Sequence, residues 1–586
     1  MRNFNGLSVL KWIISAFFLL FLIIPLLSVF LVSFTGQPIN LLGSLTNLDT
    51  LNTNIEKFKG SSLEYYSEII ARSGYLDALK NSLGLALLVS LLVILMCIPI
   101  AYGIARTTMP FKKTISALCT IPLIIPTFIS AYAFILMFGR TGWFTQLYQA
   151  IGFEGSFINP YTMTGIVLVQ VFFFFPYALW PMVAAFKISD VTLEEASQNM
   201  GAKSWVTLLF VTFPLALPGM ISSALLIFTV SFSDFGTPII LAPKDLNLIV
   251  VEAYREIAGF FNWAGAAILT VIMVLVAAFF FWLQNLLIKG KDYGSVSGKP
   301  KKQKLNDNKL VTRLLAAYSG LVVLVPLFAV LSVVLQSFAT TWGASPLPRG
   351  YTLRHYQTVF TSSFENISNS IILATGALIL SVVIATFVSY FVVRQNAAKL
   401  DFLTSLPLVV PGIAFGIALI QTFNTAPLQL TGTALILIIA YSIRRLPYMI
   451  RSTMGTMRSI KKDIEEAAVN LGATPLTAAI TVIGPLMLPG IAAGSILVFV
   501  TVIKETSISV LMAPAQWAPM SLAIFQNILR GEYYTAAAMS VLLIIIVLIL
   551  QALAKKVSTQ NTKKKVRKDV TGGARHQEET QVGQGL

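Results

Sequence analysis

Long apolar runs alternate with short polar segments along most of the chain. Runs of about 20 residues, the length that an α-helix needs to cross the hydrocarbon core of a bilayer, recur about twelve times. The first run follows Arg2 and Lys11 and is too long for a signal-peptide core, so we expect it to be retained. The pattern predicts spans over residues 12–33, 79–105, 114–138, 159–186, 214–241, 264–288, 313–337, 368–393, 400–424, 431–450, 485–512 and 532–554.

Composition supports an all-α polytopic membrane protein. Of the 586 residues, 56% are hydrophobic and 11% are charged, which excludes an ordinary soluble domain. The excess of 42 Lys and Arg over 25 Asp and Glu is no sign of a nucleic-acid partner, because the basic residues cluster between apolar runs. Short basic loops of this kind stay in the cytoplasm of membrane proteins. These clusters are residues 106–113, 289–304, 444–462 and 563–568.

The second half of the chain repeats the first. "IPLIIPTF" from Ile121 corresponds to "LPLVVPGI" from Leu406, and residues 176–219 align with residues 447–490 without a gap, at an offset of 271. We infer a tandem duplication that gives two parallel repeats of about six spans each.

The duplication predicts four parts. They are a first half at 1–288, a cytoplasmic basic linker at 289–312, a second half at 313–554 and a cytoplasmic basic tail at 555–586.

A polar, acidic segment interrupts both halves at the same offset: "EEASQNMG" in the first and "EEAAVNLG" in the second. Each copy predicts a short helix that begins with a capping box, Thr192 with Glu195 and Asp463 with Glu466. We expect Gly201 and Gly472 to end these helices in the left-handed conformation, and a second helix to follow.

Each predicted short helix also has one apolar stripe. The stripes are Leu193, Ala196 and Met200 in the first copy and Ile464, Ala467 and Leu471 in the second. An even number of spans separates the copies, so both face the same side, and flanking basic residues place that side in the cytoplasm. A merely sturdy loop is the alternative, but the duplication kept the acids as well as the stripe, which favours a docking element for a cytoplasmic partner.

These segments resemble the EAA loop of the membrane subunits of type I binding-protein-dependent ABC importers. The family pattern is Glu-Ala-Ala followed by Gly and later by Leu-Pro. The second copy fits it with Glu466-Ala467-Ala468, Gly472 and Leu488-Pro489, whereas the first copy departs from it at Ser197.

The resemblance implies a type I permease fold in a bacterial cytoplasmic (inner) membrane, and a transport subunit that is not itself an enzyme. It implies two copies of a cytoplasmic ABC ATPase subunit, which would bind the ATP and Mg²⁺, and an extracytoplasmic substrate-binding protein. This chain would bind no cofactor, and it has no phosphate-binding loop, since "GSVSGK" is one residue short. The residues that would couple to the ATPase are Glu194, Glu195, Ala196 and Gly201 with Glu465, Glu466, Ala467 and Gly472.

The fifth span of each half contains an acid at equivalent positions, Asp234 and Glu505. An ionisable group inside a membrane suggests a translocation pathway or a charge pair. The pathway candidates are Ser233, Asp234, Lys504 and Glu505, and no metal site is certain. Alternatively, the two acids cap helix ends or pair with Lys504. Two facing carboxylates would favour a cation as cargo.

The fused, double-length form with "SDFGTP" and "KETS" also resembles the ferric-iron branch of the family. Ferric iron is therefore the expected cargo, with 2-aminoethylphosphonate or another small solute as the alternative. An ion-coupled secondary transporter also has repeats, but it has no reason to carry duplicated docking segments. A membrane enzyme would need clustered catalytic groups, which the sequence does not show.

Overall fold

The computed structural model describes residues 6–61, 65–67, 73–188, 191–288, 305–343, 345 and 347–553. Most of the predicted linker (289–304) and the predicted tail (555–586) lie outside the described residues. The described part is built from helices and contains two isolated β-bridges, Thr107 with Asn306 and Ala339 with Tyr351, but no strand. The predicted all-α class is confirmed.

The helices of the first half, with π and 3₁₀ segments marked η, are α1 (Gly6–Phe18), η1 (Leu19–Ile23), α2 (Ile24–Thr35), α3 (Leu41–Ser44), α4 (Leu48–Lys59), α6 (Ser73–Arg106), α7 (Lys112–Leu118), η2 (Ile121–Ile124), α8 (Thr127–Phe138), α9 (Trp143–Ala150), α10 (Met163–Ile188), α11 (Val191–Asn199), α12 (Ser204–Thr207), η3 (Leu208–Thr212), α13 (Phe213–Phe232), α14 (Gly236–Leu241), α15 (Ile249–Ala258) and α16 (Trp263–Ile288).

Those of the second half are α17 (Lys309–Phe338), α18 (Arg354–Ser362), α19 (Phe364–Gln395), α20 (Ala398–Ser405), η4 (Leu406–Leu408), α21 (Gly412–Phe423), α22 (Ala434–Ser459), α23 (Lys462–Asn470), α24 (Pro475–Ala478), η5 (Ala479–Ile483), α25 (Gly484–Ile503), α26 (Ser509–Met512), η6 (Ala515–Trp517), α27 (Met520–Arg530) and a last helix, Tyr533–Leu553.

Within the described residues, nine helices are long and apolar enough to cross a membrane, or up to eleven if two bent pairs each count as one span. The prediction of about twelve spans therefore exceeds this number. The predicted span that is not among these eleven covers residues 431–450, which belong to α22. This helix carries Arg444, Arg445, Arg451 and Arg458, and it lies between α19 and α25 as α10 lies between α6 and α13.

The third span of each half is bent by 107°. The breaks fall at Pro126, between η2 and α8, and at Pro411, between η4 and α21. A proline disfavours the helical conformation in the residue before it, so the chain turns at these points. The repeated "IPLIIP" and "LPLVVP" segments thus explain why both halves bend alike.

The entrance to the fifth span is a π-helical turn in both halves. These turns are η3 and η5, and each precedes a helix with proline near its start, Pro214 in α13 and Pro485 in α25. Because proline has no N–H to donate to the preceding turn, regular α-helical bonding fails there and the turn widens.

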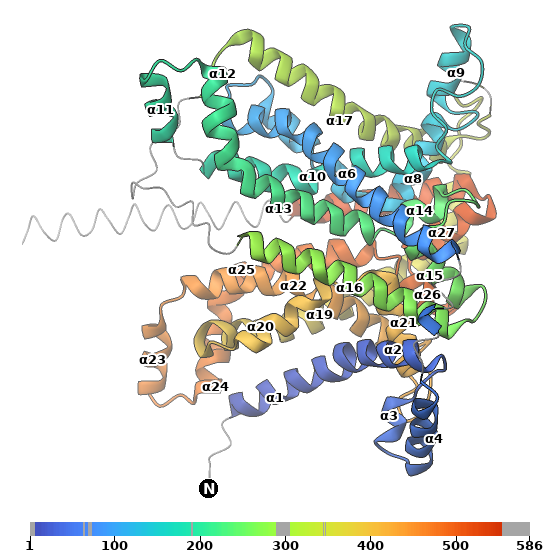
Figure 1. Cartoon of the computed structure of the whole chain (residues 1–586), viewed down its shortest axis with the longest axis vertical. Coiled ribbons are helices and arrows are strands. Elements are labelled where there is room, and N and C mark those ends of the chain that lie inside the picture. Colours follow the sequence, from blue (N-terminus) through green and yellow to red (C-terminus); the bar gives the residue numbers. More distant parts are fainter. Residues whose placement is uncertain are drawn as a thin grey trace, which may run out of the picture.

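The two halves share one hydrophobic core, because the first helix of each packs against the other half. Helix α17 lies along α6 and α8, and α2 lies against α21 (Figure 1). Across this contact the buried Tyr132 hydroxyl donates a hydrogen bond to Gln336 Oε1 at 2.8 Å. The sequence repeats are therefore not separately packed units.

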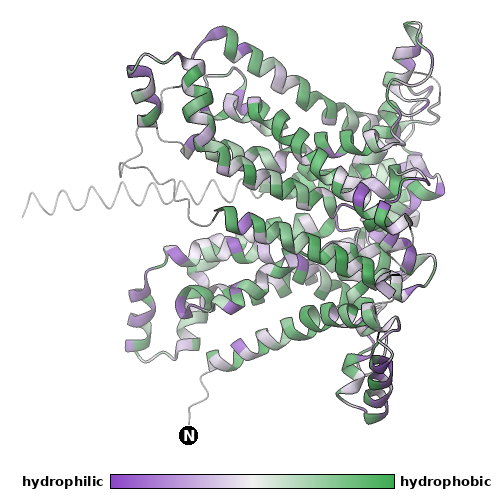
Figure 2. Ribbon diagram, in the orientation of Figure 1, coloured by the Kyte–Doolittle hydropathy of each residue, from purple (hydrophilic) through white to green (hydrophobic). Residues whose placement is uncertain are grey.

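Polar residues concentrate at two opposite ends of the molecule, and the band between them is largely apolar (Figure 2). One end carries α11 and α23, and the other carries α4 and α9 (Figure 1). We refer to them as the α11/α23 end and the α4/α9 end.

The close approach of α25 to α22 generates a prediction. A Cβ on Gly490 would lie 2.3 Å from Thr456 Oγ1 and 2.9 Å from the Ser452 carbonyl. We expect Gly490→Ala to lower the stability of the folded protein by about 1–3 kcal/mol, the usual cost of overpacking, measured as thermal unfolding in detergent.

Gly320→Ala is the matched control. It lies within α17, where an added Cβ meets no heavy atom within 4 Å. Alanine favours helix more than glycine does, so this variant should unfold at the same or a higher temperature. Equal stability of the two variants would contradict the packing described for α22 and α25.

Candidate functional site

The two acidic segments fold alike. Helices α11 and α23 end at glycine turns, in which Gly201 has φ +88° and Gly472 has φ +95°. In each turn the amide after the glycine bonds back to the last helical turn, Ala202 N to Ser197 O and Ala473 N to Ala468 O, both at 3.1 Å. The predicted left-handed glycines are confirmed, and each turn is followed by a short second helix.

The predicted capping box of the second copy is wrong. Helix α23 begins at Lys462, and its N-cap Lys461 makes no side-chain bond, so Asp463 lies inside the first turn. There its charge complements the positive end of the helix dipole instead of capping an amide. Glu466 pairs with Lys462 at 3.0 Å.

In the first copy Thr192 also lies within the helix, since α11 begins at Val191. The preceding residues, 189–190, are outside the described part. The helix that follows is capped in the second copy, where the Thr474 hydroxyl accepts from Thr477 N at 3.2 Å.

Each acidic segment begins with two adjacent glutamates. The first of the two points inward and forms an ion pair with an arginine at the end of the second span of its half. Glu194 forms an ion pair with Arg106 at 3.0 Å and accepts a hydrogen bond from the Thr212 hydroxyl. Glu465 forms an ion pair with Arg394 at 3.1 Å and accepts from the Tyr390 hydroxyl. Since all four charged side chains are at most 18% exposed, these pairs are held away from water. We call them the anchor pairs.

The opposite side of each short helix is exposed at the α11/α23 end (Figure 1). Met200 is 83% exposed and Leu471 is 90% exposed, which is unusual for side chains of this size and character. We call these surfaces the docking faces. They consist of Leu193, Glu195 and Ala196 on α11 with Met200 directly after it, and of Ile464, Glu466 and Ala467 on α23 with Leu471 directly after it.

Asp234 lies in the break between α13 and α14 and caps α14. Its carboxylate accepts from the amides of Gly236 at 3.2 Å and Thr237 at 3.3 Å, and from Gln170 Nε2 at 3.0 Å. Ser233, the neighbouring pathway candidate, ends α13. The buried carboxylate is therefore satisfied by neutral donors.

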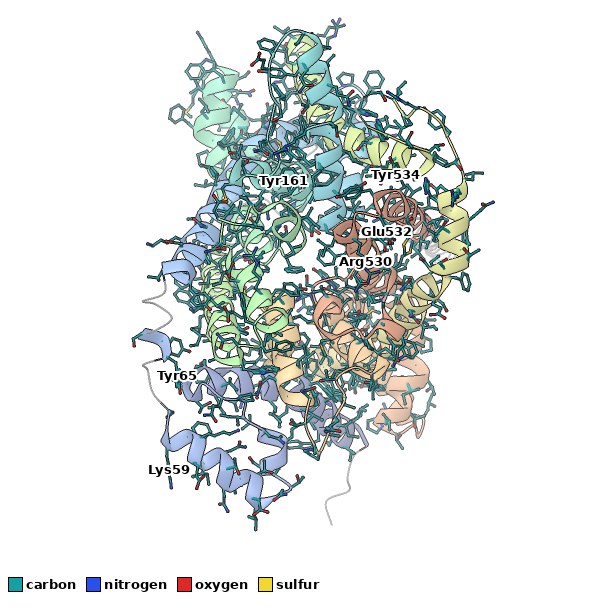
Figure 3. All side chains as sticks on the ribbon, turned by 90° about the vertical axis from the view of Figure 1, so that its right-hand side faces the viewer. Lys59, Tyr65, Tyr161, Arg530, Glu532 and Tyr534 are labelled. Atoms are coloured by element: carbon teal, nitrogen blue, oxygen red, sulfur yellow. The ribbon has the colours of Figure 1, made fainter. Side chains whose placement is uncertain are left out.

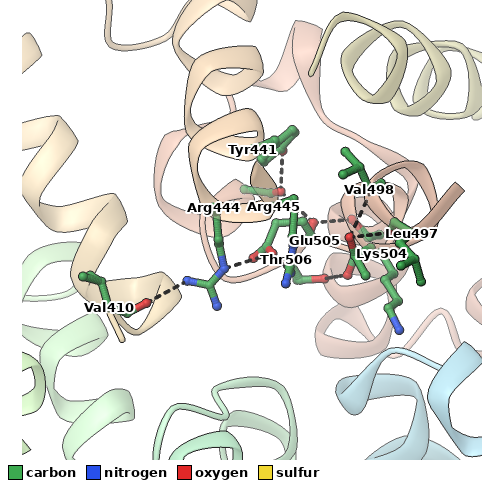
Figure 4. A network of polar contacts seen from close by, with 12 residues as sticks. Val410, Tyr441, Arg444, Arg445, Leu497, Val498, Lys504, Glu505 and Thr506 are labelled. Carbon is green, nitrogen blue, oxygen red and sulfur yellow. Dashed lines mark hydrogen bonds and ion pairs between the residues drawn. The ribbon is translucent and has the colours of Figure 1, made fainter. Parts of the chain in front are cut away.

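Glu505 lies in the equivalent break between α25 and α26, but its partners are cations. It pairs with Arg445, and Arg444 Nε lies 3.4 Å from Glu505 Oε2 (Figure 4). Lys504, the partner considered from the sequence, instead donates to the carbonyl of Leu123 in the first half. Asp234 thus has the capping role of the alternative interpretation, whereas the expected pairing of an acid with Lys504 is wrong, because Glu505 is held by arginines.

Sequence reasoning missed the cations that hold these acids. In the sequence, Arg106, Arg444 and Arg445 stand out only as members of basic clusters, and Arg394 lies directly after the predicted span 368–393. The sequence did indicate a partner for Arg444 and Arg445, because an arginine inside an otherwise apolar run is costly and implies a nearby acid.

A polar cavity of about 460 Å³ opens at the α4/α9 end. It is lined by α18, α27 and their neighbours, including Asn366, Asn527, Arg530 and Glu532. Figure 3, which views this end, shows Arg530 and Glu532 close together. In the described part of the chain, no three His, Cys, Asp or Glu side chains are grouped so that they could hold a metal ion.

Comparison of the sequence with known proteins places this chain in a family. The profile of the binding-protein-dependent transport system inner membrane component matches residues 97–293 and 397–560, once in each half. A ferric transport system permease protein of Actinobacillus pleuropneumoniae is 28% identical over 74% of this chain and 64% of its own length. A putative ferric transport system permease protein of Haemophilus influenzae is 28% identical over 70% of this chain and 66% of its own length.

The matches therefore span just under two thirds of these two relatives. A molybdenum transport system permease protein of Azotobacter vinelandii is 30% identical over 35% of this chain and over 92% of its own length. Because the family profile recurs at equivalent places in both repeats, the chain belongs to the family of inner-membrane components of binding-protein-dependent transport systems.

Proposed function

We propose that this chain forms the cargo pathway of an ABC importer and couples it to ATP hydrolysis in separate subunits. The observation that carries the proposal is the pair of docking faces on α11 and α23, which are exposed on one side and held by anchor pairs on the other. Two equivalent faces suit two copies of one ATPase subunit.

The anchor pairs give a route for coupling. A force on α23 reaches α19 through Arg394 and Glu465, and it reaches α25 through the turn at Gly472 and the π segment η5. In the first half, Glu194 contacts both Arg106 of α6 and Thr212 at the end of η3. A movement of either short helix would thus displace two spans of its own half together.

The partners follow from this arrangement. The α11/α23 end lies in the cytoplasm according to the distribution of basic residues, and there each ATPase subunit would bind ATP and Mg²⁺. The α4/α9 end would then receive a substrate-binding protein. The chain itself would bind no cofactor.

The proposed cargo is ferric iron, and 2-aminoethylphosphonate or another small solute is the second candidate. The support for iron is the likeness to permeases named for ferric transport. Asp234 and Glu505 add none, since each has a structural partner.

The docking faces generate a prediction. We expect Met200→Asp combined with Leu471→Asp to weaken binding of the ATPase subunit at least about tenfold, because exposed apolar residues at the centre of an interface contribute most of its energy. The measurement is co-purification of the ATPase with the tagged permease, together with the yield of folded permease.

The control is Leu48→Asp, which changes a 75% exposed leucine on α4 at the other end. It should leave ATPase binding unchanged. Full ATPase binding by the double variant would show that the faces on α11 and α23 are not the docking surface.

The anchor pairs generate a second prediction. Glu465→Gln leaves Arg394 without its carboxylate, and removing one member of a buried pair costs about 3–5 kcal/mol. We expect the variant to bind the ATPase but to hydrolyse ATP without cargo uptake. Exchanging the charges, Arg394→Glu with Glu465→Arg, should recover part of the uptake. Normal uptake by the single variant would exclude the anchor pair from coupling.

The cargo proposal is tested by uptake of radioactive iron into cells that make the complete transporter. Ferric iron should accumulate in an ATP-dependent manner and should not be displaced by excess 2-aminoethylphosphonate. Uptake of labelled 2-aminoethylphosphonate without uptake of iron would reverse the order of the two candidates.

A further inference from the structure

Two arginines contact one carboxylate at the break between α25 and α26, and a lysine at the same break extends from it to the first half. Arg444 and Arg445 both pair with Glu505, and Lys504 is its neighbour in the chain. Three cations and one anion leave a net charge of +2 (Figure 4). We call Arg444, Arg445 and Lys504 the cation cluster.

Two carbonyl groups accept hydrogen bonds from this cluster, and being neutral they do not cancel its charge. Arg444 Nη1 donates to the Val410 carbonyl at 3.3 Å, and Lys504 donates to the Leu123 carbonyl. Within the described residues, the buried Nε of Arg445 makes no hydrogen bond, and that of Arg444 has only the 3.4 Å ion-pair contact with Glu505. The cluster therefore keeps both excess charge and unused donor capacity.

The first half of the chain serves as an internal control for the fold. At the offset of 271, Arg444 and Arg445 correspond to Phe173 and Phe174, and Lys504 corresponds to Ser233. That half builds the same break around Asp234 with neutral donors and without an ion pair in the described residues. The architecture does not require these cations.

Neutralisation of Glu505 does not require all three cations either, since one arginine would be enough. Additional cations in a low-dielectric site cost several kcal/mol each unless they meet negative charge. The cluster is therefore better explained by binding of a negatively charged ligand than by a contribution to the stability of the folded protein.

The cluster faces the boundary between the two halves. Lys504 extends toward η2 of the first half, where it reaches the Leu123 carbonyl (Figure 4). In secondary transporters built from repeats, cargo sites lie at the interface between the repeats, and we take the same boundary as the pathway here.

We propose that the cation cluster recognises negatively charged oxygen atoms of the cargo, so that the cargo crosses as an anion. The ligand chemistry is a carboxylate or a phosphorus oxyanion, either free or wrapped around a ferric ion. This inference rests on the proposed function, since it takes the boundary between the halves as the cargo pathway. Arginine binds such groups with two parallel hydrogen bonds, whereas a bare trivalent cation would be repelled.

The test uses two variants that leave the Arg445–Glu505 pair in place. Lys504→Ser installs the residue found at the equivalent position of the first half, and Arg444→Gln removes the longer of the two contacts with Glu505. Arg451→Gln is the matched control, because it removes the same charge from α22 at a 56% exposed position. Lys504→Arg tests rescue by a residue of the same charge.

The full-length permease in lipid nanodiscs is titrated with citrate, inorganic phosphate and ferric citrate at constant ionic strength, with chloride as the reference. We expect at least one of the three to bind, and each of the two variants to weaken that binding about tenfold through loss of a nearby unit charge. Arg451→Gln and Lys504→Arg should bind as the unmodified protein does. Binding of ferric citrate alone would identify the iron complex as the ligand, and binding of citrate or phosphate alone a free anion.

The proposal is overturned if none of the three anions binds, or if Lys504→Ser and Arg444→Gln bind as tightly as the unmodified chain. Because this measurement needs neither an ATPase nor a binding protein, it is independent of the coupling experiments. Failure of the docking-face variants to affect the ATPase would contradict the proposed function and leave the anion result standing.

Discussion

The low dielectric of the apolar band is the constraint on which the rest of the structure depends. Inside it, a backbone or side-chain polar group that lacks a partner within the protein is costly. Asp234 meets this demand with two amides and Gln170, and Glu505 meets it with two arginines. The two breaks that follow the fifth spans are tolerated because these carboxylates and their partners lie in them.

The same constraint explains why polar contacts join the halves. The Tyr132 hydroxyl reaches Gln336, and Lys504 reaches the Leu123 carbonyl, each across the boundary between the repeats. Helices α2 and α17 pack against the opposite half, so one core holds both repeats. At the α11/α23 end the anchor pairs provide Glu194 and Glu465 with partners inside the protein. The apolar stripes of α11 and α23 face outward on the opposite side.

Much of this arrangement could be predicted from the sequence. The apolar runs predicted the helices, the offset of 271 predicted the repeats, and Gly201 and Gly472 predicted the turns because only a left-handed glycine ends a helix so readily. The capping box at Asp463 was wrong, because the pattern does not distinguish an N-cap acid from an acid in the first turn. The partners of Glu505 were missed because Arg444 and Arg445 lie 60 residues or more before it, and only packing brings them together.

The central claim is that α11 and α23 are two equivalent docking elements for one kind of cytoplasmic subunit. The most direct measurement is photo-crosslinking in intact membranes from a photoreactive amino acid placed at position 200 or at position 471. The account predicts that both positions crosslink to the same ATPase polypeptide. Crosslinks from neither position to an ATPase, or to different proteins from the two positions, would contradict it.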